Sequence, residues 1–203
     1  MQRTFDKEAI IAAVREVESR TAAEVVVEIR TLSGSYAHAD ARFAALLALI
    51  SLVVLVFMPF VVPPVAVILD PVVVYLAGII FVRRNDSLRR LFSTSAERMT
   101  AVRTHAAAMF HDRGIANTRA ETGLLLYASL LERRIEVLAD RGLLRQLVPH
   151  DWNALLNDLR KERVLDSDAI VAAIRSLGEL LARDVPRGAD DVNEFADMPE
   201  IGA

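Results

Sequence analysis

The sequence predicts an α/β sandwich whose chain is interrupted by two transmembrane helices. Three observations predict this fold class. Residues 43–82 are almost entirely apolar, and Asp70 is their one charge. Short apolar or β-branched runs typical of strands lie on both sides of that block. Segments with the apolar spacing of amphipathic helices flank those runs, as in proteins that cover a sheet on both faces.

Length and composition exclude several classes of protein. A chain of 203 residues can form one domain of ordinary size plus a small appendage. The net charge of −3 gives no overall bias toward nucleic acid. The chain has no cysteine, which excludes a disulfide framework, a thiolate nucleophile and a cysteine metal site.

Residues 1–42 are expected to supply the first helix and the first strand of the soluble domain. Residues 6–19 carry apolar side chains at helical spacing, namely Ile10, Ile11, Val14 and Val17. Residues 23–30 are short and β-branched, which predicts a strand. Residues 32–40 contain Ser, Gly and Tyr, and we expect them to form a linker into the membrane.

Residues 43–82 are predicted to cross a membrane twice as a helical hairpin. About 20 apolar residues span the hydrocarbon core, so forty make two spans. Pro63 and Pro64 break the helix near its middle and leave spans at 43–62 and 64–82. A buried hairpin of a soluble protein is the alternative, which is disfavoured because neither span has a polar face. The charged amphipathic segment before the block argues against a signal peptide.

Asp70 is the candidate functional residue within the membrane. It lies about 9 Å from the turn between the spans. The apolar residues of its span contribute roughly −4 to −7 kcal/mol to insertion, against about +3 kcal/mol for a central Asp. Such an acid is a candidate for proton passage or helix pairing. The simpler interpretation is a carboxylate that reaches water near the far interface or is protonated.

The arginines predict the orientation of the hairpin. Arg42 precedes the first span, and four arginines follow the second at Arg83, Arg84, Arg89 and Arg90. The turn carries no Lys or Arg, so both termini are predicted to be cytoplasmic in a bacterial inner membrane. Attraction to anionic lipid explains the cluster, whereas a nucleic-acid site would need interleaved aromatic residues.

Residues 83–185 are expected to complete the soluble domain. Thr94 and Glu97 form a capping box that opens a helix ending at Gly114. Residues 123–131 and 134–140 form a β-hairpin, in which the apolar first strand is central in the sheet. Two amphipathic helices follow, one over residues 150–162 and one starting after Asp166 or Ser167, and residues 186–203 form an acidic, irregular tail.

The first strand cannot be stable alone and must pair with the later strands. Residues 1–42 and 83–203 therefore have to lie on the same side of the bilayer. A hairpin of two spans returns the chain to the side from which it left. The need to close the domain thus supports the count of two spans independently.

Three segments resemble the TPM-domain family, often labelled TPM phosphatase. They are residues 18–27 (ESRTAAEVVV), residues 121–142 (ETGLLLYASLLERRIEVLADRG) and the acidic residues 190–197 (DDVNEFAD). The resemblance implies an α/β/α sandwich with a small, mainly parallel sheet and frequent membrane anchoring. It also implies acid phosphatase activity with a divalent cation such as calcium or magnesium for some relatives, and roles as assembly factors for others. Many relatives are anchored by terminal segments, whereas here the helices interrupt the domain.

Candidate catalytic residues are charged side chains near strand ends: Glu24, Glu121, Glu136, Asp140 and Arg141. Ligands collect beyond the carboxyl ends of parallel strands, and Asp140 suits that geometry best. Asp140 and Glu24 are the candidate metal ligands, and Arg141 the candidate phosphate contact. Ordinary solvated charge is the alternative for each. The sequence contains no glycine-rich phosphate loop and no Gly-x-Ser-x-Gly motif, and its four histidines lack ligand spacing.

Two functions from different classes remain. The first is a non-catalytic interaction or assembly module that is tethered to the lipid bilayer and binds another membrane protein, not nucleic acid. The second is a phosphatase assisted by a divalent metal. A weaker third idea makes the hairpin part of an oligomeric pore that uses Asp70.

Overall fold

The chain has a mixed α/β fold that divides into two compact units. The computed structural model describes residues 5–59, 61–117, 121–162, 164–188 and 200–202. The first unit comprises the chain up to Ser33 and from Met99 onward, and the second comprises Gly34–Arg98. The second unit is therefore an insertion in the chain of the first.

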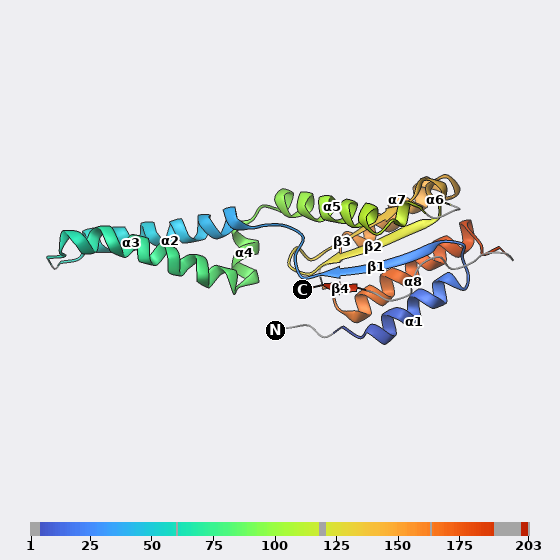
Figure 1. Ribbon diagram of the computed structural model, residues 1–203, viewed down its shortest axis with the longest axis horizontal. Coiled ribbons are helices and arrows are strands. Elements are labelled where there is room, and N and C mark those ends of the chain that lie inside the picture. Colours follow the sequence, from blue (N-terminus) through green and yellow to red (C-terminus); the bar gives the residue numbers. More distant parts are fainter. Residues whose placement is uncertain (1–4, 60, 118–120, 163, 189–199, 203) are drawn as a thin grey trace. The chain divides into compact units, whose positions relative to one another are not determined.

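A mixed sheet forms the centre of the first unit (Figure 1). Its strands are β1 (Glu24–Arg30), β2 (Gly123–Ser129), β3 (Arg134–Ala139) and the short β4 (Glu200–Gly202), in the order β3-β2-β1-β4. β1 runs parallel to both β2 and β4, whereas β2 and β3 are antiparallel. The predicted hairpin of the second and third strands and the central place of β2 are confirmed, since every residue of β2 is buried.

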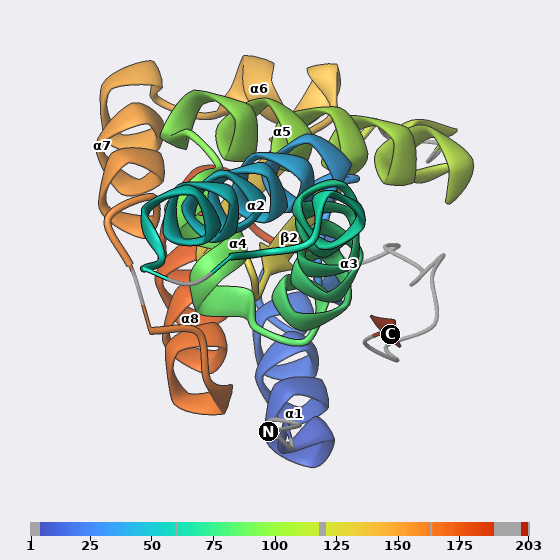
Figure 2. The same cartoon turned by 90° about the vertical axis from the view of Figure 1, so that its left-hand side faces the viewer.

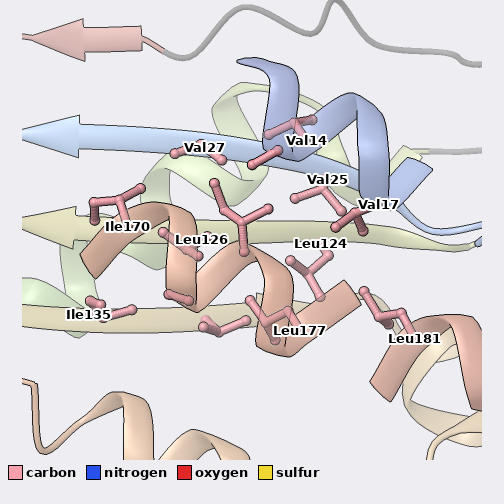
Figure 3. Packing of buried hydrophobic residues seen from close by; sticks show 14 of the residues in the cluster. Val14, Val17, Val25, Val27, Leu124, Leu126, Ile135, Ile170, Leu177 and Leu181 are labelled. Atoms are coloured by element: carbon pink, nitrogen blue, oxygen red, sulfur yellow. The ribbon is translucent and has the colours of Figure 1, made fainter. Parts of the chain in front are cut away.

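Helices cover both faces of this sheet. α1 (Lys7–Glu18) and α8 (Ser167–Asp184) pack on one face, and α5 (Ser95–Asp112) lies over the other (Figure 1). Alternate residues of β1 and β2 point into the larger core between the sheet and the first two helices (Figure 3). α7 (Pro149–Leu159) adds Trp152 and Leu156 to that core. The smaller core beneath α5 includes Val102, Ala106, Phe110, Leu125 and Tyr127.

Local signals in the sequence set the helix boundaries. The carboxylate of Asp6 accepts from the N–H of Ala9 at 3.0 Å and opens α1, and Asp166 caps α8 in the same way. The predicted capping box is present: the N–H of Glu97 donates to Thr94 Oγ1 at 3.1 Å, and Glu97 accepts from the N–H of Thr94 at 2.7 Å.

Two long apolar helices and one short helix make up the second unit. They are α2 (Ala37–Phe57), α3 (Pro64–Arg83) and α4 (Asp86–Phe92). α2 and α3 pack side by side (Figure 2) and are long and apolar enough to span a membrane. The break at the two prolines is confirmed, with Pro64 as the first residue of α3. α2 begins six residues before Phe43, because the predicted linker is already helical from Ala37.

The structure adds elements that the sequence pattern does not predict. α4, the single turn η1 (Ile115–Asn117) and α6 (Arg141–Gln146) are each seven residues or shorter, too short to show a helical apolar period. The tail is also not wholly irregular, because residues 200–202 pair with β1. Most of the predicted acidic tail, including the 190–197 motif, lies outside the described residues.

Candidate functional site

The predicted acidic residues lie at the amino ends of β1 and β2. Glu24 is the register partner of Gly123, and the N–H of Asp140 donates to the carbonyl of Gly123 at 2.9 Å. Residues in one row of a sheet share a face, so Glu24 and Asp140 flank Gly123 on the face covered by α5. The prediction that Asp140 lies at the carboxyl edge of the parallel strands is wrong. β3 is antiparallel to β2, so its end lies beside the start of β2.

Local structure accounts for one carboxylate oxygen of Asp140. Its side chain is 9% exposed and accepts from the N–H of Arg141 at 2.6 Å, at the start of α6. Glu24 is also buried, whereas Glu121 and Arg141 are exposed. Glu121 forms a solvent-exposed ion pair with Arg145, at a distance of 3.9 Å. The structure therefore brings the four residues to one edge of the sheet but divides them between its interior and its surface.

The two candidate metal ligands lie in one row of the sheet, on either side of Gly123. Their backbones are two strands apart, roughly 10 Å, and one carboxylate oxygen of Asp140 is buried without a hydrogen-bond partner. Over the described parts of the chain, no group of three or more His, Asp or Glu side chains could hold a metal ion.

Gly123 is required where it stands. A Cβ at this position would lie 2.2 Å from the carbonyl oxygen of Ile115, which belongs to the backbone of η1. We expect Gly123→Ala to lower the free energy of unfolding of the first unit by about 1–3 kcal/mol, because η1 must move. Urea denaturation measures the change. Gly188→Ala is the control, because a Cβ at that position would meet nothing within 4 Å. An equal loss of unfolding free energy in both variants would contradict the clash with Ile115 as the cause.

Ion pairs line the sheet face beneath α5. The carboxylate of Glu28 is 1% exposed and lies 2.6 Å from Arg30 and 3.0 Å from Arg113. Glu136 lies 2.8 Å from Arg160 and 3.7 Å from Arg103. Arginines thus neutralise both acids. Glu136 was one of the candidate catalytic residues; Glu28 was missed, although the alternation of charged and apolar residues along β1 indicates it.

A second polar group occupies the carboxyl ends of β1 and β2. Ser33 Oγ lies 2.8 Å from the Tyr127 hydroxyl and donates to Ser129 Oγ at 2.6 Å. The N–H of Ser33 donates to Glu132 at 2.9 Å, and Ser129 also donates to that carboxylate. Burial raises the pKa of the Tyr127 hydroxyl. All four side chains are buried, so the network fastens the segment after β1 to the turn after β2.

The second unit has its own buried acid. Asp40 is 2% exposed and accepts two hydrogen bonds from Arg89, both at 2.9 Å, while Arg83 lies 3.5 Å away. This hydrogen bonding to Asp40 raises the pKa of the Arg89 guanidinium. Arg89 was interpreted as a contact for anionic lipid, but in the structure it neutralises Asp40.

Glu97 joins the capping box to the start of α2. It lies 3.1 Å from Arg42 and 3.4 Å from His38. The hydrogen bond from the Thr94 N–H and the contact with Arg42 lower the pKa of Glu97 from 4.5 to about 2.

A depressed folded-state pKa means that the stabilisation from Glu97 is present above pH 4.5 and is lost as the pH falls toward 2. We therefore expect the melting temperature of the full chain to fall more steeply over this window than that of Glu97→Gln. Melting curves recorded by circular dichroism check this expectation. Glu8→Gln, which removes an exposed carboxylate in α1, is the control. Parallel profiles for Glu97→Gln and the unmodified chain would contradict it.

Asp70 contacts the neighbouring apolar helix. Its carboxylate accepts a hydrogen bond from Ser51 Oγ of α2, a residue that the sequence analysis did not single out. Gly78 allows the two helices to approach closely, since a Cβ there would lie 3.1 Å from the Cα of Ala44. The predicted role of Asp70 in helix pairing would use this hydrogen bond with Ser51.

Comparison with known proteins identifies the fold. The chain is similar to the NMR structure of BA42 protein from the psychrophilic bacterium Bizionia argentinensis, with a TM-score of 0.53 and 15% sequence identity. The match covers 97% of this chain and 92% of that chain. No family model and no curated protein matches the sequence. The likeness shows the fold alone, which is TPM-domain-like.

Proposed function

We propose that this chain is a membrane-anchored, TPM-like interaction or assembly module of the bacterial inner membrane. The second unit is the anchor, and the first unit lies at the cytoplasmic face, where it binds another membrane protein. The lipid bilayer is the first partner, and neither a cofactor nor a nucleic acid is required.

One observation carries the proposal. β1 precedes the two apolar helices in the chain and β2 follows them, yet the strands pair in parallel along their full length, from Glu24 with Gly123 to Arg30 with Ser129. Both flanks of the insertion therefore belong to one folded unit and must share a compartment. A two-span hairpin meets this requirement, whereas a single span does not.

The exposure of the hairpin supports a bilayer as its surroundings. A core helix of a soluble protein is mostly buried, but only 17% and 11% of the most apolar windows of α2 and α3 are buried. Large side chains along both helices are open to the surroundings, among them Leu49, Val53, Phe57, Ile68, Val73 and Ile80. An exposed apolar surface of this extent is stable in hydrocarbon and aggregates in water.

The distribution of arginine supports the cytoplasmic side. Five arginines flank the hairpin, and the sequence between Phe43 and Val82 has no Lys or Arg. Positive residues concentrate on the cytoplasmic side of bacterial inner-membrane proteins. Arg89 is engaged by Asp40, so the exposed Arg84 is the clearest contact for anionic lipid.

The state of the acidic residues favours a module without catalysis. Asp140 caps α6, and Glu28 and Glu136 are neutralised by arginines. A metal-assisted phosphatase would need several acids converging on one cation, and among the residues that the structure describes no group of three or more His, Asp or Glu side chains could hold one.

Chemical cross-linking in native membranes, followed by purification of the full chain, tests the function. We expect a membrane protein to co-purify in a fixed ratio with the full chain, and to be lost when a flexible linker replaces residues 35–93. The same preparation is assayed on a generic phosphate ester with added Mg²⁺ or Ca²⁺. Hydrolysis that disappears in Asp140→Asn would replace this proposal with the phosphatase alternative.

A further inference from the structure

Asp70 lies in apolar surroundings without a cation nearby in the sequence. It is about six residues from the start of α3, or ~9 Å along the helix axis. The stretch from Phe43 to Val82 contains no Lys, Arg or His. Ions inside a membrane are expensive and are usually paired with an opposite charge. The hairpin itself cannot supply that charge.

The contact with Ser51 leaves most of the acceptor capacity of Asp70 unused. An ionised carboxylate offers about four acceptor positions, and a serine hydroxyl donates a single hydrogen bond. The Ser51 hydroxyl takes one of these positions. The side chain of Asp70 is also only partly buried against α2, so the remaining positions are accessible from outside the hairpin.

Pro71 adds a second acceptor beside the carboxylate. Pro71 lies inside α3 and has no N–H, so the carbonyl of Val67, one turn earlier, receives no helical hydrogen bond from it. Val67 lies three residues before Asp70, so the two residues are on the same side of α3. The site therefore combines a carboxylate, a carbonyl oxygen and a hydroxyl that is already donating.

This chemistry selects one kind of occupant. A group with several N–H donors and a positive charge satisfies both acceptors, as an Arg or Lys side chain does. A second copy of this chain would bring another carboxylate and no cation at the same depth. A neutral apolar helix would leave the acceptors unsatisfied in hydrocarbon.

We propose that Asp70, with the Val67 carbonyl, is a docking site within the membrane for a basic side chain on a transmembrane helix of a partner protein. The inference rests on the proposed function and specifies its partner. The basic residue lies about six residues from the extracytoplasmic end of its helix, at the depth of Asp70.

Synthetic transmembrane helices test the site in the full chain reconstituted in phosphatidylcholine vesicles. Three Leu/Ala helices of roughly 22 residues carry a single Arg, Gln or Leu about six residues from one end. Binding of each synthetic helix is measured by energy transfer between a dye on that helix and a dye on Val61→Cys of the chain. Val61 is fully exposed in the turn. We expect the Arg helix to bind about tenfold more tightly than the Gln helix. Asp70→Asn keeps the shape and the acceptor for Ser51 but should abolish this preference.

Asp70→Glu keeps the charge and should retain the preference, and Ser51→Ala should change it by less than about threefold. Equal binding of the three helices, or an unchanged preference in Asp70→Asn, would overturn the inference. Self-association of the chain that requires Asp70 and excludes the Arg helix would also overturn it, in favour of a second copy. Flotation with the vesicles and resistance to carbonate extraction distinguish failure of the docking site from failure of the proposed function. A chain that inserts but shows no preference for the Arg helix refutes only the docking site. A chain that does not insert refutes the proposed function as well.

Discussion

Arg89→Met is expected to lower the free energy of unfolding of the second unit by about 3–5 kcal/mol. The substitution removes both 2.9 Å hydrogen bonds to Asp40, whose carboxylate is 2% exposed. Asp40 then keeps its contact with Arg83, which is longer, at 3.5 Å. Removing one partner of a buried ion pair is costly because the other keeps its charge without compensation. Steric trapping in detergent micelles or bilayers measures the unfolding free energy of the second unit.

The double variant Asp40→Leu/Arg89→Met makes the experiment specific. Replacing a whole buried pair by apolar residues is often neutral, so we expect the double variant to recover most of the lost stability. Arg84→Met removes an exposed arginine from the same segment and should change stability by less than about 0.5 kcal/mol. A neutral Arg89→Met, or a double variant weaker than the single one, would contradict the role assigned to the pair.

Leu126→Ala is expected to destabilise the first unit by about 3–5 kcal/mol. Leu126 is fully buried at the middle of β2, where it faces the core formed with α1 and α8 (Figure 3). It is also the register partner of Val27 in β1, so it lies where the two halves of the chain meet across the insertion. The cavity left by the missing methyl groups adds to the lost transfer free energy.

The chain provides its own probe for this measurement. Trp152 is the single tryptophan, and it belongs to the core of the first unit, so its fluorescence follows unfolding of that unit. Leu144→Ala, at a 43% exposed position of α6, is the control and should change stability by less than about 1 kcal/mol. Equal losses in the two variants would contradict the central place of Leu126 in the core of the unit.

Elements with a local cause could be predicted from the sequence. Asp6 and the Thr94–Glu97 box mark helix starts through hydrogen bonds to residues three positions away. Pro63 and Pro64 end a helix by backbone chemistry alone. The uninterrupted apolar run of β2 predicts a strand covered on both faces, and α5 and α8 cover it.

Features that depend on distant partners could not be predicted in this way. Residues 200–202 form a strand because β1 lies beside them, and nothing in their own sequence indicates it. The burial of Asp40 depends on Arg89, 49 residues away. Asp140 lies at the opposite edge of the sheet from the one expected, because β3 runs antiparallel to β2 and the rule for ligand sites at carboxyl ends holds for parallel strands.

The chain lacks cysteine, so single cysteines and a membrane-impermeant maleimide can report the side of each position directly. In sealed inner-membrane vesicles with the cytoplasmic face outward, we predict labelling at Arg20→Cys and Arg145→Cys, on the two sides of the insertion. Val61→Cys should react only after the vesicles are opened, and Val73→Cys should stay unlabelled within the hydrocarbon. Labelling of Arg20→Cys and Arg145→Cys from opposite faces, or recovery of the protein in the soluble fraction without detergent, would contradict the account of a single folded unit anchored by a two-span hairpin.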